Sequence, residues 1–111
     1  MGKQKISEGL KRFIREQIQT LARLEVLLLL HHHQPRALTL AEMSNELGFE
    51  DDAVEAQLAA LEAIELVTHS NTEHFKYKYH PNNAAVGSMV DQLAVSYGTH
   101  RVPILSMILS E

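Results

Sequence analysis

The sequence predicts a mainly α-helical protein with one small β-hairpin, built around a helix-turn-helix and extended by helices at both ends. Apolar residues recur at helical spacing in most segments, whereas residues 74–80 alternate strictly. Residue types that start and end helices stand at the borders of these segments. With 111 residues, 45% of them hydrophobic, and no linker or internal repeat, the chain is expected to form a single domain over 1–111.

The first two helices are predicted from their apolar residues. One face of the first helix collects Ile6, Leu10, Phe13, Ile14, Ile18 and Leu21. Thr20 is placed to cap a second helix, which is apolar almost all round from Leu24 to Leu30 and is therefore the expected core helix. Pro35 ends it, because the residue before a proline is pushed out of the helical region.

A helix-turn-helix is predicted over about 39–65. Thr39 and Glu42 have the spacing of a capping box, and Gly48 suits the left-handed end of the short helix that follows. Asp52 and Glu55 repeat the capping spacing at the start of the next helix. Two short helices joined by a glycine-containing turn are typical of this motif.

A β-hairpin is predicted over about 66–80, with Phe75, Tyr77 and Tyr79 facing inward because alternate residues of a strand share one face. Pro81 ends its ladder.

A last helical segment is predicted over about 83–110, capped by Asn82 or Asn83. Gly98 and Pro103 interrupt it, so the chain ends either as a kinked continuation or as a short helix beginning at the proline.

This order of elements resembles a winged helix-turn-helix domain over about residues 20 to 98. The stretch LTLAEMSNELGFEDDAVEAQLAALEAIELV, followed by HFKYKYH, is similar to the core of bacterial MarR-like and ArsR-like regulators. It also resembles a group of small uncharacterised bacterial winged-helix proteins whose buried helix begins much like residues 24–30. The resemblance implies a transcriptional regulator that binds double-stranded DNA as a homodimer. Its second motif helix would enter the major groove, and its hairpin wing would contact the backbone or minor groove.

The charge pattern conflicts with part of that implication. The whole chain has a formal charge of −4, but residues 42–65 hold eight carboxylates and no Lys or Arg, a charge of −8. Phosphate binding depends on Lys and Arg, and guanine is mostly read by these side chains. Gln57 is the one side chain of the expected recognition helix suited to reading adenine. An alternative function is therefore a winged-helix module that binds a protein partner or dimerises without binding DNA.

Positive charge lies elsewhere: residues 1–23 carry a formal charge of +4, and the outward face of the hairpin is basic. We therefore expect any DNA contact to come from the wing and the N-terminal helix, the alternative being that these are ordinary solvated faces. The candidate DNA-binding residues are Gln57, His74, Lys76, Lys78, Arg36, Lys11, Arg12 and Arg15.

The C-terminal segment is apolar at seven of the eight positions from 102 to 109, which favours an interface between two copies of the chain. The alternative is that it packs inside one copy. The candidate interface residues are Leu10, Phe13, Ile14, Val102, Ile104, Leu105, Ile108 and Leu109.

Other chemistries find little support in the sequence. The absence of cysteine excludes disulfides and thiolate sites, and no motif of a phosphate loop, zinc protease or nucleophile elbow is present, so we expect no enzyme activity, catalytic residue or cofactor. Three consecutive residues point about 100° apart on a helix, so His31, His32 and His33 are expected to form a polar helix end and not a metal site. His69, His74 and His80 are expected to be exposed strand residues, with pH sensing as the alternative. No secretory or membrane-spanning segment is predicted, which favours the cytoplasm.

Overall fold

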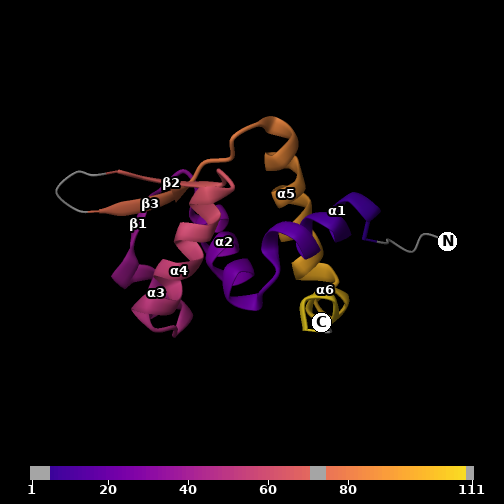
Figure 1. The fold of residues 1–111 in the computed structure, drawn as a ribbon, viewed down its shortest axis with the longest axis horizontal. Helices are drawn as coiled ribbons and strands as arrows, with labels where there is room; N and C mark the ends of the chain where they lie inside the picture. The colour runs from indigo at the N-terminus through magenta and orange to yellow at the C-terminus, as the bar shows by residue number, and fades with distance from the viewer. Residues whose placement is uncertain (1–5, 71–74, 110–111) are drawn as a thin grey trace.

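The computed structural model describes residues 6–70 and 75–109, and its element order agrees with the predicted fold class. The helix-turn-helix and a small sheet form one end of the long axis (Figure 1). Three helices gather at the other end: α1 (Glu8–Phe13), α5 (Ala84–Thr99) and α6 (Arg101–Leu109). The central helix α2 (Leu21–His33) lies between them. The Cα atoms extend over 52 × 28 × 21 Å.

The N-terminal segment folds as the short helix α1 (Glu8–Phe13), which continues into a π-helical turn, η1 (Ile14–Ile18). Gln19 then takes a positive φ of 66°, which ends the helical path. Thr20 caps α2 as predicted, its side chain accepting the Arg23 N–H. The buried face of α2 is the centre of the hydrophobic core and consists of Leu24, Val26, Leu27 and Leu30.

The predicted capping box is present at the start of α3 (Leu40–Leu47). The Glu42 N–H donates to Thr39 Oγ1 at 3.1 Å, and the Thr39 N–H donates to Glu42 Oε1 at 2.8 Å. Gly48 ends the helix in the left-handed region, with φ 73°. Local chemistry alone therefore sets both ends of this helix.

The second predicted capping pair is wrong. Helix α4 (Asp51–Ala63) begins after Glu50, which takes the extended N-cap conformation and forms no side-chain capping bond. Asp52 is therefore already inside the helix, where its carboxylate can act only through the helix dipole. The turn that follows Gly48 decides where α4 starts.

The wing is formed by β2 (Val67–Ser70) and β3 (Lys76–Tyr79), paired antiparallel with Val67 opposite Tyr79. A two-residue strand, β1 (Leu38–Thr39), adds to the other side of β3 and gives the sheet order β1-β3-β2. It was not predicted, since two residues leave no periodic signal.

Tyr77 and Tyr79 are buried as expected, but the prediction that Phe75 faces the core is wrong, because 46% of its surface is exposed. It lies beyond the edge of the core, and its ring packs on that of His69 with centroids 4.5 Å apart.

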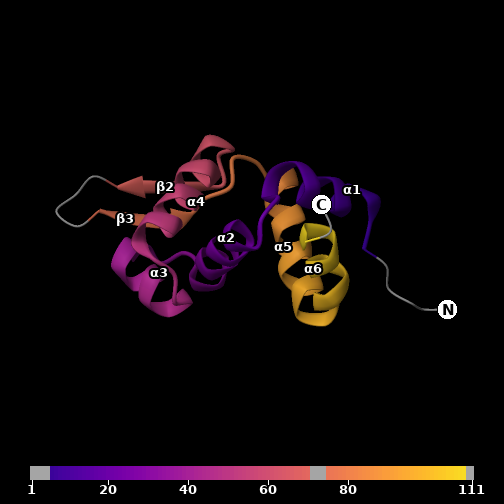
Figure 2. The ribbon, with the colours of Figure 1, turned by 60° about the horizontal axis from the view of Figure 1, so that its bottom comes forward.

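The C-terminal part is two helices, α5 (Ala84–Thr99) and α6 (Arg101–Leu109), which pack against each other (Figure 2). Helix α5 also contacts α1, and α6 also contacts η1. Asn83 caps α5 by accepting the Val86 N–H at 2.9 Å. Of the two predicted alternatives, the separate short helix is correct. It begins two residues before Pro103, which fits the first turn because the N–H that proline lacks has no helical partner there.

Candidate nucleic-acid interface

The solvent-facing side of α4, the expected recognition helix, is acidic and otherwise lined by methyl groups. Its exposed acids are Asp51, Asp52 and Glu55, and its exposed alanines are Ala53, Ala56, Ala59 and Ala63. The opposite side, with Val54, Leu58 and Leu61, is buried in the core. This helix therefore presents no cation to a phosphate and repels one at its N-terminal end.

Gln57 does not lie on that outward face. It is half-buried, and its Oε1 accepts a hydrogen bond from Arg23 Nε at 3.1 Å. The same guanidinium donates to the main-chain oxygen of Gln17 and to the side chain of Gln19, both at 3.2 Å. Gln57 and Arg23 thus tie α4 to the start of α2, and this position gives no support to base reading by Gln57.

The wing presents exposed cations. Lys76 and Lys78 point away from the buried face of β3, and neither forms an ion pair within residues 6–70 and 75–109. His80 is also exposed, whereas His74 lies outside the described residues.

Arg36, another candidate, lies 3.7 Å from the carboxylate of Glu42. Glu42 accepts a hydrogen bond from the Thr39 main chain, and this bond, with smaller effects of Arg36 and Lys76, lowers the pKa of its carboxyl group. The carboxylate consequently stays charged and offsets part of the positive charge of Arg36 and Lys76.

The N-terminal candidates lie far from the wing. Lys11 pairs with Glu8 at 3.4 Å, while Arg12 and Arg15 are exposed. Helix α1 lies at the opposite end of the long axis from the sheet (Figure 1). The structure therefore does not bring the two basic groups together, and a duplex touching both would run along the 52 Å axis, which corresponds to roughly 15 base pairs at about 3.4 Å each.

The predicted dimer residues divide into two sets. Leu10, Ile14, Ile104 and Ile108 are buried by the chain's own helices, so the alternative of packing inside one copy describes these four. Phe13 and Leu105 are partly buried. Val102 and Leu109 remain 72% and 68% exposed, so the predicted interface narrows to one stripe of α6.

Two histidines have carboxylate partners that were not predicted from the sequence. His31 Nε2 lies 2.8 Å from Asp91 Oδ1, and its ring meets that of Tyr79 edge-on with centroids 5.1 Å apart. His31 therefore connects α2 to α5 and the wing. His69 Nδ1 pairs with Glu62. Sixty positions separate His31 from Asp91, so no local spacing could have indicated that pair.

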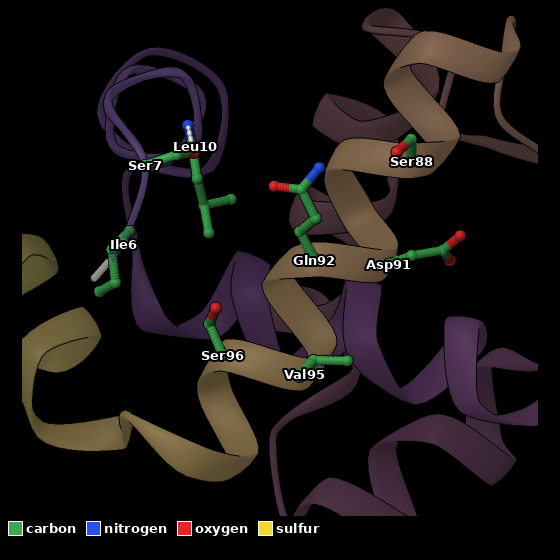
Figure 3. Close-up of a pocket in the computed structure, with 8 residues that line it drawn as sticks. All are labelled: Ile6, Ser7, Leu10, Ser88, Asp91, Gln92, Val95 and Ser96. Atoms are coloured by element: carbon green, nitrogen blue, oxygen red, sulfur yellow. Dashed lines mark hydrogen bonds between the residues drawn. The ribbon is translucent and has the colours of Figure 1, made fainter. Parts of the chain in front are cut away.

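A shallow pocket of about 350 Å³ lies between α1 and α5. Gln92 and Ser96 point from α5 toward Ser7 and Leu10, whereas Asp91 projects away on the other side of the helix (Figure 3). Amide and hydroxyl groups over an apolar floor can hydrogen-bond a small molecule. The eight lining residues contain no pairing of a nucleophile with a base.

Neither a metal site nor a membrane span is found in the described ranges. Within residues 6–70 and 75–109, no three His, Asp or Glu side chains are grouped to hold a metal ion. No helix in those ranges combines the length and apolar character needed to span a bilayer.

No protein-family model and no curated protein matches the sequence. Solved structures do match the fold. A mutant of S. aureus MepR bound to an oligodeoxyribonucleotide has a TM-score of 0.63 at 16% identity, with 89% of this chain and 72% of that chain covered. A possible transcriptional regulator from Methanosarcina mazei Go1 has a TM-score of 0.61 at 17% identity, covering 92% of this chain and 89% of that one. A mutant of Lactococcus lactis ZitR has a TM-score of 0.58 at 20% identity, with 96% of this chain and 62% of that chain covered. These similarities confirm the predicted winged-helix fold.

Proposed function

We propose that this chain is a non-enzymatic DNA-binding module of the transcriptional-regulator type, which acts as a homodimer and contacts the DNA backbone through its wing. The observation that carries the proposal is the exposed, unpaired state of Lys76 and Lys78 among the described residues, on a fold shared with a protein bound to an oligodeoxyribonucleotide. Lysines free of ion pairs can displace the counterions of phosphates without first breaking a bond within the protein.

In this proposal α4 supports the fold and does not read bases. Its outward carboxylates repel phosphate, and the amide of Gln57 is held by Arg23. Arg12 of α1 and Arg15 of η1 form a second, separate contact to the backbone. Binding of this kind depends strongly on salt and weakly on DNA sequence.

The test is a titration of a labelled DNA duplex at two salt concentrations with the parent chain and a Lys76→Gln, Lys78→Gln variant. Loss of two phosphate contacts should make the slope of log affinity against log salt shallower by about 2. A Ser88→Asp, Gln92→Glu variant changes the net charge equally on the exposed side of α5 and should keep the parent slope.

A second function is favoured by the acidic face of α4: a winged-helix module that binds a protein partner and not DNA. It predicts no binding of the duplex by the parent at low salt. If the parent does bind, but the lysine variant has the same affinity and the same slope, the wing is not the contact.

A further inference from the structure

The outer edge of β2 is open. In the sheet order β1-β3-β2, β2 has a strand neighbour on one side only, and Figure 1 shows it as the outermost strand. The His80 N–H donates to the Leu66 oxygen at 2.9 Å, which identifies Leu66 as a hydrogen-bonded position of the ladder. Because such positions alternate in an antiparallel pair, the main-chain N–H and C=O groups of Val67 and His69 point away from β3. An antiparallel neighbour forms its hydrogen bonds with every second residue of a strand, so Val67 and His69 offer the main-chain groups with which an added strand would pair.

A hollow of about 450 Å³ follows this edge. Its lining includes Val67 and His69, whose side chains lie on one face of the strand, and Thr68, which lies on the other. The lining also includes His80 and Asn82, which follow β3, so the hollow extends from the edge of β2 past the start of the strand. It leaves room beside Val67, Thr68 and His69 for an added chain.

The charge at this hollow is negative. Glu62 and Glu65 line it at the C-terminal end of α4, where the last turn contains no basic residue. The helix dipole is itself negative at that end, so carboxylates there are unfavourable unless a cation lies nearby. The imidazole of His69 pairs with Glu62, whereas Glu65 has no ion-pair partner among the described residues. Among the described residues, no Lys or Arg lines the hollow, and His80, which does line it, forms no ion pair with Glu65.

We propose that the outer edge of β2 binds an extended segment of a partner protein that carries a Lys or Arg side chain. The segment pairs through its main chain with Val67 and His69 and places its cation beside Glu65. Nucleic acid does not fit, because the hollow is acidic. A second copy of this chain does not supply the cation either, because residues 62–70 contain no Lys or Arg.

The experiment is an amide NMR titration of the intact chain with blocked pentapeptide mixtures that have Arg at the centre and Val, Ile, Thr or Tyr elsewhere. Matched mixtures have Glu at the centre or N-methylated main chains, and free arginine amide is a further probe. Shifts at the amides of Val67 and His69 are expected with the Arg mixture, at least tenfold weaker binding with the Glu mixture, and none with the N-methylated one.

A Glu65→Gln variant should weaken the Arg mixture about threefold, as expected for one exposed ion pair. Glu46→Gln, on the exposed face of α3, is the matched control and should leave binding unchanged. The proposal is overturned if millimolar Arg mixture leaves Val67 and His69 unshifted, or if Glu65→Gln binds like the parent. It is also overturned if N-methylated peptides or arginine amide bind as tightly as the Arg mixture, since no strand is then added. Pairing of this edge between two copies without peptide would overturn it as well.

Discussion

Replacing Val102 and Leu109 by Glu is expected to convert a homodimer of this chain into folded monomers. The two side chains are 72% and 68% exposed and seven positions apart, so they lie on one stripe of α6 with Leu105 between them. Ile104 and Ile108 occupy the other face and are buried in the core. The outward stripe can therefore be changed without disturbing the packing of the protomer.

The expected size of the effect follows from these exposures. Burying a Val or Leu side chain completely is worth about 1.5–3 kcal/mol, so covering the exposed part of each contributes roughly 1–2 kcal/mol. A two-fold interface uses both residues from both copies, which amounts to about 4–8 kcal/mol, or on the order of 10³–10⁶ in the dissociation constant. Each Glu also introduces a charge that is costly to bury without a partner.

The assay is sedimentation or light scattering over a wide range of protein concentration, with circular dichroism to show that the helices are retained. Val95→Glu is the matched control, because Val95 is 66% exposed but lies on α5, outside the stripe. It should remain dimeric. A monomeric parent chain, or a Val102→Glu, Leu109→Glu variant that dimerises like the parent, would show that this stripe is not an interface.

Four further predictions concern stability, each measured as the free energy of unfolding in denaturant. Leu27→Ala, at a fully buried position of α2, should lose about 2–5 kcal/mol, and a loss under 1 kcal/mol would contradict the described core. Thr39→Ala should lose about 1 kcal/mol by removing the α3 cap. Because the pKa of Glu42 is lowered in the fold, its stabilising effect is present above its unfolded pKa and is lost as pH falls through the folded one, so Glu42→Gln should approach the parent stability in acid. Tyr79→Phe should be neutral or slightly stabilising at pH 7, since the buried hydroxyl has no hydrogen-bond partner in the described structure. Burial raises the pKa of Tyr79 to about 12, so the parent should lose up to about 1.4 kcal/mol per pH unit from about pH 10 upward, and the Phe variant should lose less.

Local signals in the sequence predict most of the helix boundaries. The caps at Thr20, Thr39 and Asn83 and the left-handed Gly48 each depend on residues within three or four positions, so the sequence contains all that is needed to place them. The cap predicted at Asp52 failed although its spacing was right. The N-cap is defined by an extended backbone, and the turn after Gly48 gives that conformation to Glu50.

Contacts between distant segments could not be predicted in this way. The His31–Asp91 pair and the bond between Arg23 and Gln57 both depend on how the helices pack. The alternation around Phe75 gives the face on which its side chain lies, but not how far the core reaches along the strand. Residues 102–109 are apolar almost throughout, so the sequence does not show which side of α6 faces the core. The structure separates the buried residues of this helix from its exposed stripe.

The carboxylates of α4 have opposite physical effects at its two ends. Asp51 and Asp52 lie at the N-terminal end, where negative charge favours the helix, so stability alone accounts for them. Glu62 and Glu65 lie at the C-terminal end, where negative charge opposes the dipole, and only Glu62 has a partner, His69, among the described residues. Asp51 and Asp52 would repel a DNA phosphate at the end of α4 that was expected to approach DNA. Glu65 is therefore unfavourable for the isolated helix, and a cationic partner at the β2 edge would explain this residue where stability does not.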